Sequence, residues 1–203
     1  MATAVQLANR ALTRAGALRI MDINENSKSG RAIAAAYDGV RDSCQSIANW
    51  RYAMVRDNLQ VTTAQDGFAY AYTIPADWLR FVAIRDRFVG VPLLGPRYIS
   101  DTQGDFSIEQ NRVLLTNYGP PLACLGVQRI TDPSLQDALF NDYFILSLCV
   151  EIWEDVSRKS GTKLQVIINE RDRALAIARN NNAIQEAPEE ENDTSWLLSR
   201  VGP

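Results

Sequence analysis

Histidine does not occur anywhere in the 203 residues of this chain. Its absence excludes Ser-His-Asp and Cys-His catalysis, HExxH zinc sites and any pH switch based on an imidazole. Carboxylate or lysine chemistry survives this exclusion, but we find no pair of convergent carboxylates for acid–base catalysis. The sequence also lacks a Walker A loop, a GxGxxG turn after a strand and a GxSxG elbow. We therefore expect a protein that is not an enzyme and has no catalytic, cofactor or metal site.

Cysteine is scarce, and its spacing fits neither a disulfide framework nor a metal site. Cys44, Cys124 and Cys149 are far apart and odd in number. Each has apolar or helical neighbours, as in the run from Ser147 to Val150. This pattern predicts buried free thiols in a reducing compartment.

An excess of positive charge is also lacking, since the net charge is -3. A protein that grips phosphates needs a basic face, so general nucleic-acid binding is not expected. Mild negative charge suits a surface that DNA passes without sticking. Arginines interrupt the apolar residues of the N-terminus, which predicts neither a signal peptide nor a membrane span. The hydrophobic share of 46% is enough for one substantial core, or for a core and a smaller module.

Helical periodicity marks both ends of the chain. Thr3 can cap a first helix that Gly16 ends, and a second helix is expected at 30–49. After Pro133, apolar residues recur at helical steps to about Ser157 and cover much of the circumference, so this helix should be central. Gly161 precedes a last helix, expected at 162–180.

The middle of the chain has the texture of β-structure. Its apolar residues alternate or form short β-branched runs between Gly, Pro, Asn and Asp. A turn at 109–112 looks like a hairpin in which Asn111 takes a left-handed backbone. We expect a small antiparallel sheet or sandwich, with strands at 54–63, 69–72, 79–85, 97–99, 106–109, 112–116 and 122–129.

These elements predict an α+β fold: a four-helix body formed from N- and C-terminal helix pairs, with an inserted small antiparallel β module and an extended C-terminal arm. The expected divisions are an N-terminal helical part at 1–50, the inserted β-rich module at 51–131, a C-terminal helical part at 132–182 and an acidic arm at 183–203.

The arm is the most informative segment. Residues 186–193 read EAPEEEND, which is too acidic to bury the apolar surface that ordering requires. Trp196, Leu197, Leu198 and Arg200 follow, and Trp and Arg most often anchor interfaces. We expect an arm that folds onto a partner. The alternative is that Trp196 tucks back onto its own domain or a neighbouring copy.

The order of these features, together with four short motifs, resembles the tail tubular protein A family, the head-to-tail adaptors of short-tailed bacteriophages. The resemblance spans almost the whole chain, and Ile74 stands where the family usually has leucine. The motifs are NWRYA at 49–53 with Leu59 in the following strand, YTIPADWLR at 72–80, the late helix 140–153 followed by a second long helix, and Asp193-x-Ser195-Trp196-Leu197 after the acidic run.

The resemblance implies a structural virion protein without a catalytic role. It would be a subunit of a ring, usually a dodecameric ring of self-copies, between the phage portal and the tail nozzle. Trp196, Leu197, Leu198 and Arg200 would contact the portal, and the β module would face neighbouring subunits or the nozzle. DNA would traverse the channel without sequence-specific binding. The protein would be made in the host cytoplasm and end in the virion, with no membrane contact.

Two other hypotheses stay open at this point. One is another phage tail or head-completion component, such as a tail-assembly chaperone, with the same helix-sheet-helix layout. The other is a small-ligand-binding domain or a carboxylate-dependent hydrolase, for which no motif speaks.

Overall fold

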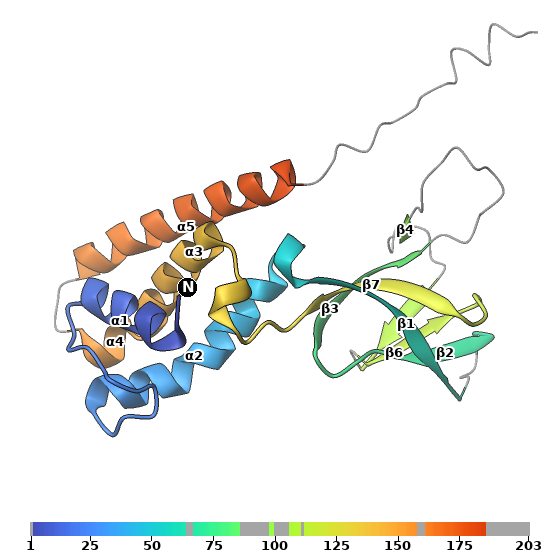
Figure 1. Ribbon diagram of the computed structural model, residues 1–203, viewed down its shortest axis with the longest axis horizontal. Coiled ribbons are helices and arrows are strands. Elements are labelled where there is room, and N and C mark those ends of the chain that lie inside the picture. Colours follow the sequence, from blue (N-terminus) through green and yellow to red (C-terminus); the bar gives the residue numbers. More distant parts are fainter. Residues whose placement is uncertain are drawn as a thin grey trace, which may run out of the picture.

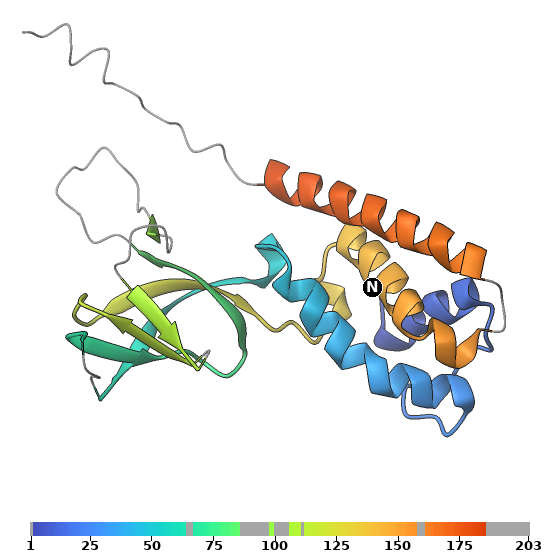
Figure 2. The same ribbon diagram turned by 180° about the vertical axis from the view of Figure 1, so that it is seen from behind.

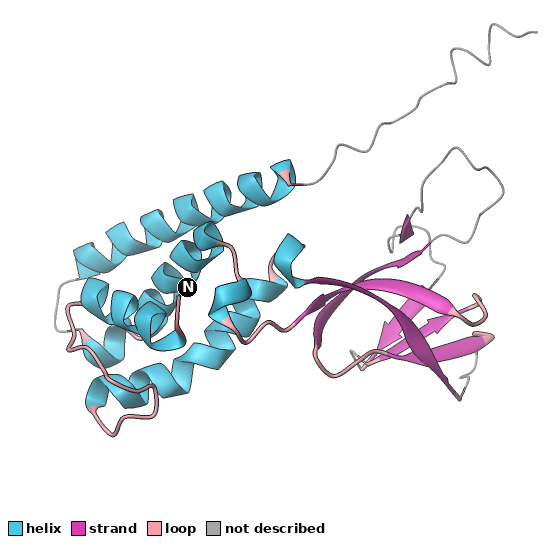
Figure 3. Cartoon of the chain, viewed as in Figure 1, coloured by secondary structure: helices cyan, strands magenta, loops and turns pink. Residues whose placement is uncertain are grey.

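A computed structural model describes residues 2–63, 67–85, 98–99, 106–110, 112–157 and 161–185. The described part has two regions, a body of helices at one end and a curled β-sheet at the other (Figure 1). The chain builds half of the body, crosses to the sheet and returns to complete the body, as the sequence colours of Figure 1 show. Figure 3 shows the helices gathered at one end and the strands at the other.

The first two helices follow from their caps. Helix α1 (Ala4–Ala15) begins with a capping box in which Thr3 and Gln6 bond each other's backbone, and it ends at Gly16 with a φ of 76°. Helix α2 (Lys28–Ser46) begins two residues earlier than expected because Ser27 accepts the backbone N–H of Gly30. The caps therefore confirm the predicted start and stop of α1 and move the start of α2.

The middle of the chain forms one antiparallel sheet, so the sandwich alternative is wrong. Its order is β4-β3-β7-β1-β2-β6-β5. Every expected strand forms, with ends that differ by no more than one residue. A short 3-10 helix η1 (Arg51–Ala53) leads into the strands, which are β1 (Met54–Thr62), β2 (Tyr70–Thr73), β3 (Trp78–Arg85), β4 (Tyr98–Ile99), β5 (Phe106–Glu109), β6 (Val113–Thr116) and β7 (Leu122–Gln128).

The sheet curls until its two ends approach each other. Phe81 of β3 and Phe106 of β5 pack edge to face with ring centroids 5.2 Å apart, although several strands separate them in the sheet. Inside the curl lies a core cluster that includes Leu59, Tyr72 and Cys124. In the hairpin between β5 and β6 the left-handed residue is Gln110, with a φ of 51°, while Asn111 lies outside the described residues.

The helical end of the chain is more broken than its periodicity predicts. Pro133 lies in a 3-10 helix η3 (Pro133–Leu135), and Asp137 then caps α3 (Ala138–Glu151) by accepting the N–H of Leu139 at 2.8 Å. A short helix α4 (Trp153–Val156) and the long helix α5 (Gly161–Ile184) follow. Helix α3 packs against α1, α2 and α5, which confirms that it is central.

The expected fold class is wrong in two respects. The body is not a four-helix body, because the described residues form five α-helices: Ile152, with a ψ of -1°, separates α3 from α4. The β part is not a small module either, since seven strands join in one curled sheet. The last helix is also longer than the expected 162–180, since α5 runs to Ile184 and takes in the first two residues of the arm expected at 183–203. The arm from residue 186 onward lies outside the described residues.

Candidate interaction surfaces

The helical body and the sheet meet where the chain enters β1 and where it leaves β7, and we call this region the joint. A buried glutamine, Gln45, holds the joint together. The side chain of Gln45 is fully buried, donates to the carbonyl oxygen of Ile130 at 2.7 Å and accepts the N–H of Ile130 at 3.0 Å. Beside it, Asp42 accepts from both Arg41 and Arg129, at 2.9 and 2.8 Å. These bonds fix the chain leaving β7 to the last turns of α2.

Residues that carry the family resemblance also lie at this joint. Arg80 of β3 donates to the side-chain oxygen of Asn49. Trp50 is buried, and its indole N–H donates to the carbonyl oxygen of Cys44 at 2.9 Å. Asn182 of α5 donates to the backbone oxygen of Asn49 and accepts the N–H of Arg51. In this structure these motif residues have a structural role: they connect α2, α5 and the sheet.

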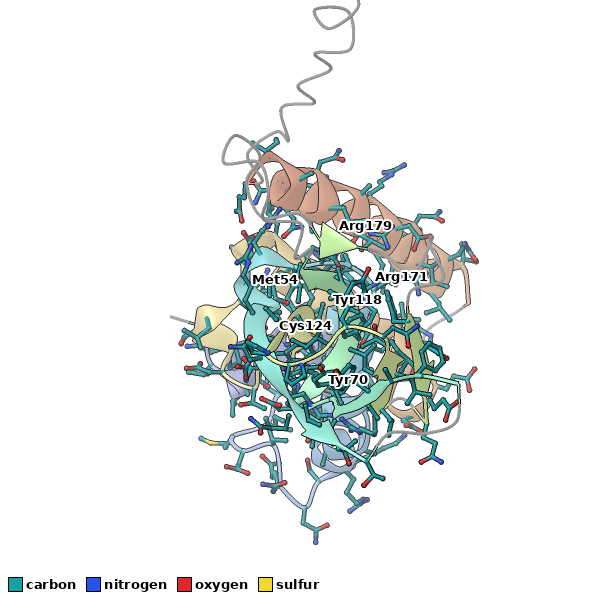
Figure 4. The ribbon with its side chains drawn as sticks, turned by 90° about the vertical axis from the view of Figure 1, so that its right-hand side faces the viewer. Met54, Tyr70, Tyr118, Cys124, Arg171 and Arg179 are labelled. Atoms are coloured by element: carbon teal, nitrogen blue, oxygen red, sulfur yellow. The ribbon has the colours of Figure 1, made fainter. Side chains whose placement is uncertain are left out.

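The three cysteines are free and buried, as predicted. Burial raises the pKa of the Cys44 thiol and raises the pKa of Cys124, inside the curl of the sheet (Figure 4), to about 12. Both therefore stay protonated at neutral pH, and protonated thiols are poor nucleophiles and poor metal ligands. Within the described ranges, no group of three or more His, Cys, Asp or Glu side chains is placed to hold a metal ion.

A groove of about 430 Å³ opens between α2 and α5, over one face of α3. Small residues of α2 form one wall, and Arg171 reaches the groove from α5. Figure 4 shows Arg171 below α5 on the same side as Arg179. Figures 1 and 2 agree that α2 and α5 lie on different sides of α3. We call this site the α2–α5 groove, defined by Ala35, Gly39, Ser43, Ser147, Glu151 and Arg171.

Helix α5 also presents apolar side chains to solvent. Val166 is 51% exposed, Ile177 56% and Ile184 82%. An α-helix turns about 100° per residue, so residues that are eleven or seven positions apart point within roughly 20° of each other. Val166, Ile177 and Ile184 have these spacings and therefore lie on one side of α5. We call Val166, Ile177 and Ile184 the α5 stripe. Exposed apolar side chains on one side of an ordered helix make that side a candidate contact surface for another chain, although Arg173 lies among them.

A smaller cavity of about 190 Å³ lies at the joint, near the C-terminal end of α5. Trp50, Tyr52 and Phe140 give it aromatic walls, and Gln185, the last described residue, also lines it. The hydroxyl of Tyr52 is buried and has no hydrogen-bond partner among the described residues, and burial raises its pKa.

The residues expected to contact a portal, Trp196, Leu197, Leu198 and Arg200, lie outside the described residues. Sequence reasoning missed the α2–α5 groove and the α5 stripe. The sequence contains a signal for the stripe, because Val166, Ile177 and Ile184 lie on a different side of α5 from Leu164, Ile167 and Ala178, which pack into the core. The sequence contains no signal for the groove, because the groove depends on how far apart α2 and α5 lie in the folded protein.

Comparison of the chain with models of known protein families found no match, and comparison with curated proteins found none either. Among the described residues, no helix is both long enough and apolar enough to cross a membrane.

Proposed function

We propose that this chain is a structural subunit of a ring-shaped adaptor that joins the portal of a short-tailed bacteriophage to its tail nozzle. The ring would leave a channel through which DNA passes without sequence-specific binding. This proposal rests on the resemblance described above and on the shape of the protein. It treats the chain as a component that acts through its surfaces.

One observation carries the proposal furthest: the body and the sheet lie at opposite ends of the protein, and buried hydrogen bonds fix them to each other (Figure 2). An adaptor needs two separate ends that meet different partners without folding onto each other. The exposed apolar side chains on α5 support the same reading, because a ring subunit must be covered by neighbouring copies. The net charge of -3 suits a channel that DNA must not stick to.

The direct test is to mix the purified protein with the portal of its phage and to measure the particles by light scattering and electron microscopy. We expect rings, either in solution or assembled on the portal. A particle that neither self-associates nor binds portal, but whose melting temperature rises with a small ligand, would refute the adaptor function.

Removal of residues 186–203 is expected to weaken portal attachment while the rest of the protein still folds. The core clusters of the described part extend no further than Ala178, so the deletion takes nothing from them. Thermal unfolding of the truncated protein should remain cooperative, and pull-down on immobilised portal should lose most of the bound protein. Loss of the cooperative transition would mean that the segment belongs to the core.

Within that segment, Trp196→Ala is expected to weaken attachment by about 2 kcal/mol per arm, the size of a typical aromatic hot spot. Ser195→Ala is the matched control, because it changes the preceding residue without removing an aromatic anchor. Titration of each variant against portal gives the two affinities. Equal affinities for Trp196→Ala and the unaltered protein would show that Trp196 anchors nothing.

A further inference from the structure

The cavity of about 190 Å³ at the joint has aromatic walls that hold each other in place. We call it the joint cavity, defined by Trp50, Tyr52, Leu135, Asp137, Phe140 and Gln185. Trp50 and Tyr52 pack against Phe140 with ring centroids 5.1 and 5.2 Å apart. An apolar cavity of about 150 Å³ accepts a benzene molecule. The joint cavity therefore has room for one aromatic side chain.

The rim of the joint cavity leaves large apolar side chains in water. Leu135, which lines the cavity, is 62% exposed, and Ile184 at the end of the α5 stripe is exposed as well. Both lie within two residues of the hydrogen bond from Gln185 to Asp137, which joins the end of α5 to the start of α3. An aromatic side chain in the cavity, with aliphatic residues next to it in the chain, would remove this apolar surface from water.

The chain itself continues from the rim of this cavity. Gln185 is the last described residue, and the sequence beyond it contains one aromatic residue, Trp196, followed by Leu197 and Leu198. Ten residues, 186–195, separate Gln185 from Trp196. Ten residues span up to roughly 35 Å when extended, and a loop of this length can also return to its starting point. Its length therefore lets Trp196 reach the joint cavity of its own chain.

The joint cavity also offers an acceptor for an indole N–H. Asp137 lines the cavity, and its Oδ2 accepts from Asn181 and Gln185 at 3.3 and 3.4 Å, which are long distances for hydrogen bonds. A carboxylate oxygen can accept a further, shorter bond, and a buried indole N–H needs such a partner. Leucine has no group to donate, so aromatic walls beside a carboxylate favour Trp196 over the leucines that follow it.

We propose that Trp196 occupies the joint cavity of its own chain in the free protein, with Leu197 and Leu198 covering the apolar rim. Residues 186–195 would then close a loop whose five carboxylates stay in water. The contact does not depend on the adaptor function, because it involves one chain alone. A portal that binds Trp196 must first draw it out of the cavity, so the two proposals describe different states of the same side chain.

Disulfide trapping in dilute full-length protein tests this contact without portal. Leu135→Cys places a thiol on the rim, and Ser195→Cys places one beside Trp196. At about 10 µM protein, a short flexible tether gives an effective concentration of about 1 mM, so the disulfide should form within one chain. We expect a cross-linked monomer of faster mobility on a non-reducing gel, and little dimer. The native cysteines are buried, and unaltered protein controls for them.

Ala176→Cys combined with Ser195→Cys is the matched control. Ala176 is exposed and lies two positions before Ala178, which lines the cavity, so it points roughly 200° around α5 from Ala178. About 14 Å of helix separates Ala176 from Gln185, which the same tether can span. The Leu135→Cys pair should close about ten-fold faster than this control, since burial of one aromatic side chain favours the docked state by that factor or more. Equal rates would overturn the proposal, because they would reflect random motion of the tether.

Trp196→Ala in the chain that carries Leu135→Cys and Ser195→Cys shows whether the indole is the anchor. The rate of closure should fall to that of the Ala176→Cys control, because the tether remains and the anchor is lost. An unchanged rate would overturn the assignment of Trp196. Dimers from a mixture of the two single-cysteine variants that form as fast as the disulfide within one chain would overturn it too, since Trp196 would then occupy the cavity of another copy.

A second measurement uses no cysteine. Trp50, Trp78 and Trp153 are buried, and Trp196→Phe removes the fourth tryptophan. The fluorescence lost on that substitution is the emission of Trp196. We expect this emission to resist quenching by acrylamide several-fold more strongly than free N-acetyltryptophanamide does. Quenching as strong as that of the free compound would place Trp196 in water and overturn the contact.

Discussion

Trp50→Ala should destabilise the protein by about 4 kcal/mol, the largest loss that we expect from a single side chain. Trp50 is 1% exposed, packs edge to face on Phe140 with ring centroids 5.1 Å apart, and stacks on Tyr52. The substitution leaves a large cavity beside one that already exists, and it removes the indole bond to Cys44. Urea unfolding followed by circular dichroism gives the free energy of unfolding.

Trp50→Phe is the matched control, because phenylalanine keeps an aromatic ring in the space but cannot donate to the carbonyl oxygen of Cys44. Its loss should be clearly smaller, with about 1 kcal/mol from the hydrogen bond and the remainder from lost volume. A free energy of unfolding for Trp50→Ala equal to that of the unaltered protein would show that the joint does not depend on Trp50.

Gly126→Ala should destabilise the sheet by about 3 kcal/mol, because β7 has no room for a methyl group at this position. A Cβ atom there would lie 2.1 Å from Cε3 of Trp78 and 2.3 Å from its Cζ3. Trp78 is buried inside the curl, and its neighbours limit where its ring can move. Thermal unfolding should show the loss as a lower Tm.

Two comparisons isolate this clash. In a Trp78→Ala background the additional Gly126→Ala change should have a much smaller effect, since the ring that it would meet is gone. Gly39→Ala should instead raise stability by about 0.5–1 kcal/mol, because Gly39 lies in a helix with open space around it. Unfolding of Gly126→Ala at the same temperature as the unaltered protein would rule out the close packing of Trp78 on β7.

The positions of the strands could be predicted from the sequence, but their assembly could not. Alternation of apolar residues and Gly or Pro punctuation are local signals, and they locate each strand to within a residue. Insertion of β7 between β3 and β1 depends on contacts between residues far apart in the chain, as does the packing of Phe81 on Phe106. Sequence periodicity therefore does not predict that the seven strands join in one curled sheet and not in a small module.

The break between α3 and α4 could not be predicted from the sequence either. Apolar residues continue at helical steps across Ile152, yet its ψ of -1° departs from the helical value and separates α3 from α4. That departure is a local change of the backbone which hydrophobic periodicity does not record. The α5 stripe could be found in the sequence, because its residues lie away from the buried face of the helix, but the α2–α5 groove exists only once α2 and α5 are placed around α3.

The hydrogen bonds of the last turns of α5 have a mechanical consequence. Asn182 bonds to Asn49 and Arg51 at 2.9 and 2.8 Å, and Arg179 bonds to the carbonyl oxygen of Ile47 at 3.2 Å. A force applied to the chain beyond Gln185 is therefore transmitted through these bonds to residues 47–51, which precede β1, and also through the packing of α5 on α3. Tension applied at the C-terminal side would be shared between the sheet and the helices, and no single helix would have to bear it alone.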